Sequence, residues 1–220
     1  MHLIVFVIAS DNLEIYKEHE KCWRSYSKCH PDVTVYFIRQ REDISSPYID
    51  GDTIWSIGKE ETNRVFEKTV TSLMMIPMQY DYVIRTNLSS VWNFTKLIEF
   101  CNTLPKTNVF CGVLGNPGLS GAGMIFSPDV VTKLVKNSDK IERCMWDDID
   151  FGKVANLCNI RSTRGYRHNI HSKEQADEAW NTGYHFYLKD MRTGTRNVEN
   201  ELMVMRYLIN KIYPSSIAEV

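Results

Sequence analysis

A chain of 220 residues is long enough for one globular domain, and its 43% hydrophobic and 24% charged residues are ordinary for a soluble protein. The formal net charge is −1, which argues against a dedicated nucleic-acid-binding protein because neutralising phosphates requires a basic excess. The apolar run at residues 1–9 is too short to span a bilayer and has no basic segment before it, so we expect neither a membrane span nor a signal peptide.

The cysteines are scattered through the chain, with no C-x-x-C pair and no zinc-type spacing. They lie at positions 22, 29, 101, 111, 144 and 158. This pattern predicts reduced thiols and a cytoplasmic location.

Short apolar runs alternate with longer amphipathic segments in the first half of the chain. The unbroken run Leu3–Ala9 predicts a strand, and Ser10-Asp11-Asn12 after it predicts a helix N-cap. We predict strands over residues 3–9, 33–38, 52–57 and 82–84, and helices over residues 13–27 and 62–80.

The second half continues the alternation less regularly. Residues 161–183 are rich in charge and histidine with few apolar anchors, which predicts a long surface loop. We predict strands over residues 109–114, 124–126, 159–163 and 184–188, and helices over residues 94–101, 128–137, 146–157 and 198–212. The whole pattern indicates an α/β fold, a single domain over residues 1–220 with a mostly parallel central sheet flanked by helices.

A polar cluster follows the buried strand at residues 82–84. In an open α/β sheet, ligands bind beyond the carboxyl ends of the strands, so these donors suit a polyhydroxylated or phosphorylated ligand. An Asx or Ser turn that caps the next helix is the alternative. The cluster consists of Arg85, Thr86, Asn87, Ser89 and Ser90.

Five glycines fall between residues 112 and 123, but no Gly-Lys-Ser/Thr follows them, so they do not form a phosphate-binding P-loop. Gly121-Ala122-Gly123 continues into the strand predicted at residues 124–126 rather than into a helix. These glycines are typical of a place where another backbone or a flat ligand comes close.

Asp147, Asp148 and Asp150 stand together at the start of a predicted helix. They could simply favour the positive end of the helix dipole. Alternatively, adjacent like charges raise one another's pKa, and a carboxylate tuned in this way could act as a general base.

A basic group surrounds the last predicted strand. It could be a solvated surface or a clamp for a diphosphate, since guanidinium and ammonium groups suit phosphate oxygens. His168 and His171 could bind a metal, but no carboxylate partner is evident beside them. The basic group consists of His185, Lys189, Arg192 and Arg196.

Several segments, taken in order, resemble nucleotide-sugar glycosyltransferases of the GT-A fold, which is Rossmann-like. The similarity covers roughly residues 3–212 and is greatest to small enzymes of large DNA viruses such as chloroviruses. Its motifs are loose individually and specific in combination. They are Glu61 with Lys68-Thr69-Val70, residues 80–90, residues 120–127, Asp147-Asp148 with Gly152, and residues 184–189.

This resemblance implies a glycosyltransferase that moves a hexose, deoxyhexose or pentose from a nucleotide diphosphate sugar, with UDP as the expected nucleotide. The expected acceptor is a glycan, such as an oligosaccharide of a capsid glycoprotein in the host cytoplasm. Residues 1–90 would hold the nucleotide, and residues 91–220 would face the acceptor. Donor binding is assigned to Ser10, Asp11, Lys68, Arg85, Asn87, Ser89, His185 and Lys189.

The same resemblance assigns the general base of an inverting reaction to Asp148, with Asp147 as the fallback. Two alternatives remain open at this point. A retaining enzyme would use these carboxylates to hold the donor sugar, and a catalytically silent protein would only bind a sugar nucleotide or glycan.

One departure from the family concerns the metal. Members that hold Mn²⁺ carry D-x-D where this chain has Asn87-Leu88-Ser89. An amide and a hydroxyl are poorer ligands for a hard dication than two carboxylates. We therefore expect a divalent cation, Mn²⁺ or Mg²⁺, to be weakly held or absent, with Asn87, Ser89 and His185 as weak candidate ligands.

Overall fold

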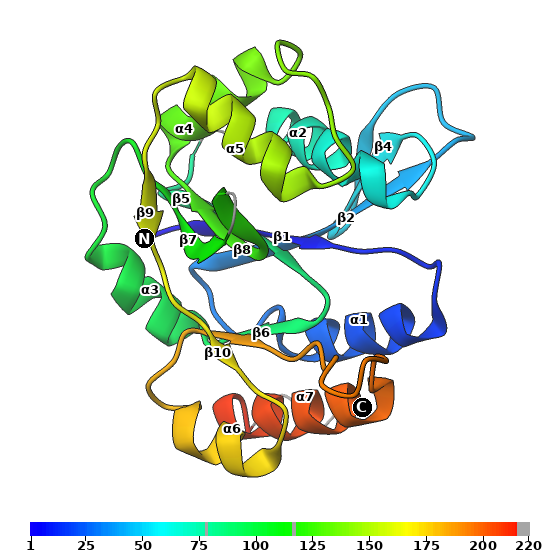
Figure 1. Cartoon of the computed structure of the whole chain (residues 1–220), viewed down its shortest axis with the longest axis vertical. Coiled ribbons are helices and arrows are strands. Elements are labelled where there is room, and N and C mark those ends of the chain that lie inside the picture. The colour runs from blue at the N-terminus through cyan, green and yellow to red at the C-terminus, as the bar shows by residue number, and fades with distance from the viewer. Residues whose placement is uncertain (78, 116–117, 215–220) are drawn as a thin grey trace.

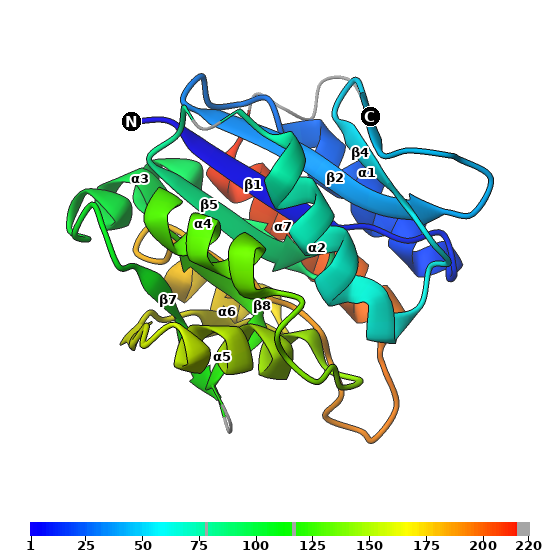
Figure 2. The same ribbon diagram turned by 90° about the horizontal axis from the view of Figure 1, so that it is seen from above.

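The computed structural model describes residues 1–77, 79–115 and 118–214, whose strands form two sheets (Figures 1 and 2). The larger sheet has the strand order β3-β4-β2-β1-β5-β8-β7-β9, and the smaller has the order β10-β11-β6. The strands are β1 (Leu3–Ile8), β2 (Val33–Arg41), β3 (Tyr48–Asp50), β4 (Thr53–Ile57), β5 (Tyr82–Asn87), β6 (Ser90–Trp92), β7 (Phe110–Gly115), β8 (Gly118–Phe126), β9 (Ser162–Arg164), β10 (His168–Asn169) and β11 (His185–Tyr187).

Helices cover both faces of the larger sheet. Figure 1 shows α2, α4 and α5 on one face, and α1, α6, α7 and the smaller sheet on the other. In the described part of the chain, no helix is long and apolar enough to cross a membrane. The helices are α1 (Glu14–Tyr26), α2 (Val65–Met75), α3 (Phe94–Asn102), α4 (Pro128–Asn137), α5 (Asp147–Leu157), α6 (Lys173–Ala179) and α7 (Val198–Ile212), and the short 3₁₀ helix η1 (Thr62–Arg64) precedes α2.

Strand β1 is apolar without interruption because both of its faces are buried. Ile4 and Phe6 belong to the core beneath α2, α4 and α5, whereas Leu3, Val5 and Val7 belong to the core on the opposite face. Successive side chains of a strand point to opposite faces, so a strand in the middle of three layers needs apolar residues at every position. This explains why the residues of β1 form an unbroken apolar run in the sequence.

The central strands β4, β2, β1 and β5 run parallel, so their carboxyl ends lie at one edge of the sheet. In this register Ile8, the last residue of β1, lies beside Ile38 of β2 and Asn87 of β5. The polar residues after β1 and after β5 are therefore neighbours. Strands β3 and β8 pair in the antiparallel direction, so the sheet is mixed towards its edges.

The prediction of a surface loop over residues 161–183 is wrong. This stretch contains β9, which pairs with β7, then β10, which pairs with β11, and the helix α6. Strands of two or three residues are too short to leave a periodic pattern in a sequence. Helix α6 buries only Ala176 and Ala179, small residues that give little hydrophobic signal.

Some predicted boundaries near the site also differ. The residues Ser10–Asn12 do not cap α1, whose N-cap position is Leu13; instead the Ser10 hydroxyl accepts a hydrogen bond from the backbone N–H of Asn12 (3.2 Å). Helix α2 ends at Met75 rather than Tyr80, because Ile76 stands before a proline and is extended. The turn after Asn87 leads into β6 and caps no helix.

No disulfide joins two cysteines in the described part of the chain, and Cys22, Cys101 and Cys111 are buried. Burial raises the pKa of Cys101 and of Cys111 to about 12. At neutral pH these two thiols are therefore protonated packing residues.

Gly123 of β8 allows the two sheets to approach each other. A β-carbon at this position would lie 2.5 Å from Cε1 of His185 and 2.9 Å from the indole ring of Trp92. These two rings are stacked, with centroids 4.0 Å apart and an angle of 8° between their planes, and both are buried. At Gly112 of the neighbouring β7, an added β-carbon would lie 2.6 Å from the backbone carbonyl oxygen of Gly123, so the expectation that another backbone comes close is confirmed there.

We expect Gly123→Ala to lower the free energy of unfolding by about 1–3 kcal/mol, the usual cost of an extra carbon in a packed core. Gly152→Ala is the matched control, since nothing lies within 4 Å of the added carbon in α5. The control should be neutral or slightly stabilising because alanine favours helices. Urea denaturation measures both values, and an unchanged midpoint for Gly123→Ala would contradict the packing argument.

Candidate functional site

A pocket of about 230 Å³ opens at the carboxyl edge of the parallel strands. The ends of β1 and β5, the start of α2 and the segment after β11 surround it. Its lining combines hydroxyl, amide, carboxylate and cationic side chains, the mixture expected for a nucleotide or a sugar. The lining residues are Ile8, Ser10, Asn12, Tyr16, Glu60, Glu61, Thr62, Val65, Lys68, Asn87, Leu88, Ser89, Tyr187, Lys189 and Arg196.

The structure brings some of the predicted site residues to this pocket and leaves others outside its lining. Ser10, Lys68, Asn87, Ser89 and Lys189 line the pocket, although they come from four separate segments of the chain. Those outside the lining are Asp11, Arg85, His185, Asp147 and Asp148.

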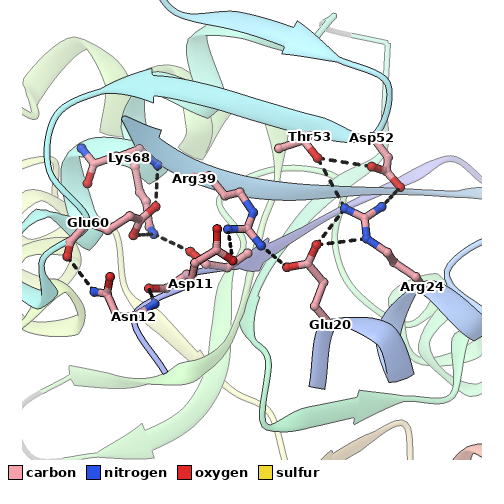
Figure 3. A network of polar contacts seen from close by, with 12 residues as sticks. Asp11, Asn12, Glu20, Arg24, Arg39, Asp52, Thr53, Glu60 and Lys68 are labelled. Atoms are coloured by element: carbon pink, nitrogen blue, oxygen red, sulfur yellow. Dashed lines mark hydrogen bonds and ion pairs between the residues drawn. The ribbon is translucent and has the colours of Figure 1, made fainter. Parts of the chain in front are cut away.

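Lys68 is held behind the pocket by an ion pair (Figure 3). Its ammonium donates to Glu60 Oε2 (2.7 Å) and to the backbone carbonyl of Ala9 (2.9 Å), and its side chain is 1% exposed. Burial lowers the pKa of Lys68, and the Glu60 carboxylate opposes this change. With two of its three protons used, Lys68 mainly fixes the start of α2 against the end of β1.

Asp11 belongs to a second chain of charges, also drawn in Figure 3. Its carboxylate pairs with Arg39 Nη1 (2.8 Å), and Arg39 also contacts Glu20 of α1. Glu20 in turn pairs with Arg24, which reaches Asp52 (2.5 Å). This chain of alternating charges ties α1 to β2 and ends beside the pocket, where Asp11 is exposed.

The segment between β11 and α7 brings two cations to the pocket. Arg196 is fixed by the fully buried Glu201, to which its guanidinium donates three hydrogen bonds of 2.6–3.0 Å. Its Cζ also lies 5.4 Å from the ring centroid of Tyr16. Lys189 is exposed and contacts no carboxylate in the described part of the chain, so its charge is available to a ligand.

Beyond Asn87, the same face of β5 carries Arg85, which is buried and paired with Asp147 at the start of α5. Two of its donors, Nε and Nη1, have no partner among the described residues. Burial raises the pKa of Asp147, the neighbouring Asp148 adds to this, and Arg85 opposes it. Arg85 fits here because Gly121 has no side chain, since a β-carbon there would lie 3.0 Å from Nη1.

Asp148 differs from Asp147 because it contacts no cation in the described part of the chain. Its Oδ1 accepts the backbone N–H of Ile149 (2.9 Å), and its Oδ2 is 3.4 Å from the backbone nitrogen of Gly121. The two carboxylates thus have different environments, one paired with a guanidinium and the other with backbone N–H groups only.

His185 does not line the pocket and reaches Asn87, which does, through Ser90. Its ring is buried against Trp92, burial lowers its pKa well below the ordinary value, and Nε2 lies 3.2 Å from the Ser90 hydroxyl. Ser90 donates to Oδ1 of Asn87 (3.2 Å). Asn87 itself lines the pocket, so its amide is the member of this series that can meet a ligand.

Sequence reasoning missed Glu60, Tyr16 and Tyr187, which all line the pocket. Tyr16 lies within the helix predicted over residues 13–27, and Tyr187 lies within the strand predicted over residues 184–188. Neither has a spacing that distinguishes a pocket residue from a core residue. The alternation along β5 could have indicated that Arg85 and Asn87 share a face.

The fold resembles that of the catalytic domain of Drosophila β1,4-galactosyltransferase 7 in complex with xylobiose, with a TM-score of 0.50 and 11% identity, covering 92% of this chain and 80% of that chain. The predicted GT-A-like α/β fold is therefore confirmed. A mutant of that enzyme in complex with manganese, UDP-Gal and xylobiose has a TM-score of 0.49 and 9% identity, covering 90% of this chain and 75% of that one.

A synthase has a comparable score. The 4-diphosphocytidyl-2C-methyl-D-erythritol synthase of Anaerococcus prevotii has a TM-score of 0.49 and 10% identity, covering 75% of this chain and 86% of that one. No protein-family model and no curated protein matches the sequence. Such distant likenesses concern the fold, so the activity has to be argued from the site.

The charged groups behind the pocket predict a dependence of stability on pH. His19 is fully buried, with Nε2 3.7 Å from Glu201, and neither ring nitrogen makes a hydrogen bond to a described residue. Burial lowers the pKa of His19 to about 4, and Arg196 adds to this. Glu201 does not reverse the shift, because Arg196 already neutralises its charge.

A histidine with a lowered folded-state pKa stabilises the fold above its unfolded value of about 6.5 and loses this contribution as the pH falls towards 4. Between pH 7.5 and pH 4.5, we expect the free energy of unfolding of wild type to fall by about 2–3 kcal/mol more than that of the His19→Phe variant. Urea denaturation at a series of pH values measures the difference. Parallel curves for the two proteins would show that His19 is not held neutral.

Proposed function

We propose that this protein is a glycosyltransferase that moves a sugar from a nucleotide diphosphate sugar to a hydroxyl group of a glycan. The observation that carries the proposal is the continuous polar face at the carboxyl edge of the sheet. A donor-rich pocket lies at Ser10 and Asn87, and the carboxylates of Asp147 and Asp148 follow beyond Arg85. A diphosphate site beside an unpaired carboxylate is what this reaction needs.

The pocket suits the nucleotide and its two phosphates. The Asn87 amide, the Ser89 hydroxyl and the Lys189 ammonium are donors for phosphate oxygens, and Arg196, whose charge is balanced by Glu201, adds N–H donors in a fixed direction. Ser10, Asp11 and Tyr16 would contact the base and ribose. UDP is the proposed nucleotide, following the resemblance in the sequence, which also makes an oligosaccharide of a capsid glycoprotein the proposed acceptor.

In the proposed reaction, the oxygen of an acceptor hydroxyl attacks the anomeric carbon of the donor sugar. The bond from that carbon to the phosphate oxygen breaks, and UDP leaves with the electron pair. Asp148 accepts the proton of the hydroxyl, and attack from the face opposite to UDP inverts the anomeric configuration. Asp147 pairs with Arg85, whose Nε and Nη1 are buried without a partner among the described residues, and in the proposed reaction this pair fixes the start of α5 and so the position of Asp148.

The residues present do not fit a tightly held divalent cation. Asn87 and Ser89 line the pocket with an amide and a hydroxyl, which are poorer ligands for a hard dication than two carboxylates, and the described residues contain no group of three His, Cys, Asp or Glu side chains that could hold a metal ion. The buried ring of His185 is bonded to Ser90 and does not line the pocket. The ammonium of Lys189, which contacts no carboxylate in the described part of the chain, would balance the diphosphate instead, with N–H donors of Arg196 beside it, and the proposed reaction includes no metal.

The two alternatives to an inverting enzyme can be distinguished by what they release. A retaining enzyme would preserve the anomeric configuration, which NMR of the first-formed product distinguishes. A silent binding protein is favoured by the replacement of a D-x-D sequence with Asn87-Leu88-Ser89. Such a protein would bind UDP but release none from UDP-glucose, UDP-galactose or UDP-xylose, with or without xylobiose or lactose.

We expect Lys189→Ala to weaken UDP binding by about tenfold or more, because a charged hydrogen bond contributes about 1.5–3 kcal/mol. Lys136→Ala, which removes an exposed lysine of α4, is the matched control and should bind like wild type. Titration calorimetry in 1 mM EDTA measures the affinities without a metal. Equal affinity for the two variants would exclude Lys189 from the site, and loss of all binding in EDTA would contradict metal-independent binding.

We expect Asp148→Asn to lower the transfer rate by about 10²–10⁴, because the amide cannot accept a proton from the acceptor. The affinity for UDP should change little, since loss of turnover with intact binding identifies a group that acts in the transition state. Asp139→Asn, an exposed aspartate before α5, is the matched control. A rate above half of wild type for Asp148→Asn would remove the assignment, and a collapse only in Asp147→Asn would move it to that residue.

A further inference from the structure

Arg167 is a half-buried cation without a carboxylate partner in the described part of the chain. Its Nε donates to Asn169 Oδ1 (3.1 Å) and its Nη1 to the Ser120 hydroxyl (2.8 Å). Its Cζ lies 4.4 Å from the ring centroid of Tyr187. Nη2 makes no hydrogen bond to a described residue, so the guanidinium keeps donors for another group.

The other buried or half-buried arginines of the described chain are all neutralised by a carboxylate. Arg39 contacts Glu20 and Asp11, Arg41 contacts Asp43, Arg85 contacts Asp147, and Arg196 contacts Glu201. Arg167 alone in this group has only neutral partners. Burial lowers the pKa of Arg167, which is the sign of a charge that has lost water and gained no counter-charge.

The surroundings of Arg167 connect it to both parts of the site. Ser120, which accepts its hydrogen bond, precedes Gly121, whose backbone nitrogen is 3.4 Å from the Asp148 carboxylate. Tyr187, over which its guanidinium stacks, lines the nucleotide pocket. Arg167 itself does not line that pocket, so Lys189 rather than Arg167 is the unpaired cation placed for the diphosphate.

We propose that Arg167 binds a carboxylate carried by a sugar substrate, so that the protein acts on an acidic sugar such as a uronic acid. The proposal rests on the glycosyltransferase function proposed above and specifies its substrate class. A guanidinium presents a planar fork of N–H groups that matches a carboxylate with two parallel hydrogen bonds. The substrate carboxylate could belong to the acceptor or to the transferred sugar. Arg167 is connected through Ser120 and Gly121 to Asp148, the proposed base, which would lie beside both sugars.

The test compares two sugars that differ only in the group at C5. Methyl β-D-glucuronide carries a carboxylate where methyl β-D-glucoside carries CH₂OH. Their affinities are measured by NMR titration of the wild-type protein saturated with UDP. UDP-glucuronic acid and UDP-glucose, compared in the protein without UDP, form the second arm, which detects a carboxylate on the donor.

We expect wild type to prefer the acidic sugar by about tenfold or more in one arm, as a charged hydrogen bond provides. Arg167→Gln should abolish this preference while leaving the affinities for UDP and for the neutral sugar unchanged. Arg167→Lys should keep part of the preference, because it keeps the charge and loses the fork. Arg164→Gln, which removes an exposed arginine of β9, is the matched control and should behave like wild type.

Three results would overturn the proposal. They are no preference in either arm, an unchanged preference in Arg167→Gln, and a loss of UDP affinity in Arg167→Gln, which would assign Arg167 to the diphosphate. If Arg167→Gln fails to fold, the Arg167→Lys comparison decides the question. A wild type that fails to bind UDP at all would refute the proposed function instead, and the two sugars can still be compared without nucleotide.

Discussion

The buried charge of Arg85 is the constraint on which the geometry of the site depends. Strand β5 lies between β1 and β8 and is covered on both faces, so a guanidinium there cannot be balanced by water. Removing one partner of such a buried pair costs about 3–5 kcal/mol. Asp147 therefore has to stay beside Arg85, and the start of α5 stays with it. The position of Asp148, the proposed base, follows from the pairing of its neighbour.

Successive side chains of β5 point to opposite faces of the larger sheet and have different roles there. Arg85 and Asn87 point to the face that holds α2 and α5, where the charges are. Thr86 points to the other face, where its hydroxyl accepts from Trp92 Nε1 (3.0 Å) and donates to the carbonyl of Ala122 (2.8 Å). Since His185 stacks on the same Trp92, the smaller sheet supports the strand that carries the pocket.

The parts of the fold that could be predicted are those with a long periodic pattern. Helix α7 has the predicted bounds because fifteen residues give several full turns, and β1 is obvious because both of its faces are buried. Strand β9 overlaps the strand predicted over residues 159–163, although its bounds differ. Strand β10 has only two residues, and its pairing with β11 is decided by contacts far along the chain. The three-residue strands β3 and β6 were not predicted either.

The site could be predicted in part, and the reason is the parallel register. Polar residues after β1 and β5 were expected to meet, and Ser10 and Asn87 do line one pocket. What the sequence could not indicate is the partner of each charge. His185 and Lys189 are four positions apart in one basic cluster, yet one is buried against Trp92 and the other is exposed at the pocket.

Cations that are paired with a carboxylate and cations that are not have different roles at the site, although they look the same in the sequence. In Arg85 and Arg196 a buried carboxylate cancels the charge, so these pairs supply fixed N–H directions and little net attraction. Lys189 and Arg167 have no carboxylate partner in the described chain, so they leave a net positive field at the site. In the proposed reaction the paired arginines would orient the substrates, and the unpaired cations would provide the attraction for anionic groups. Salt screens the field of unpaired, exposed cations. Raising the ionic strength should therefore weaken the binding of anionic substrates, while the directions of the N–H groups fixed by the buried ion pairs stay the same.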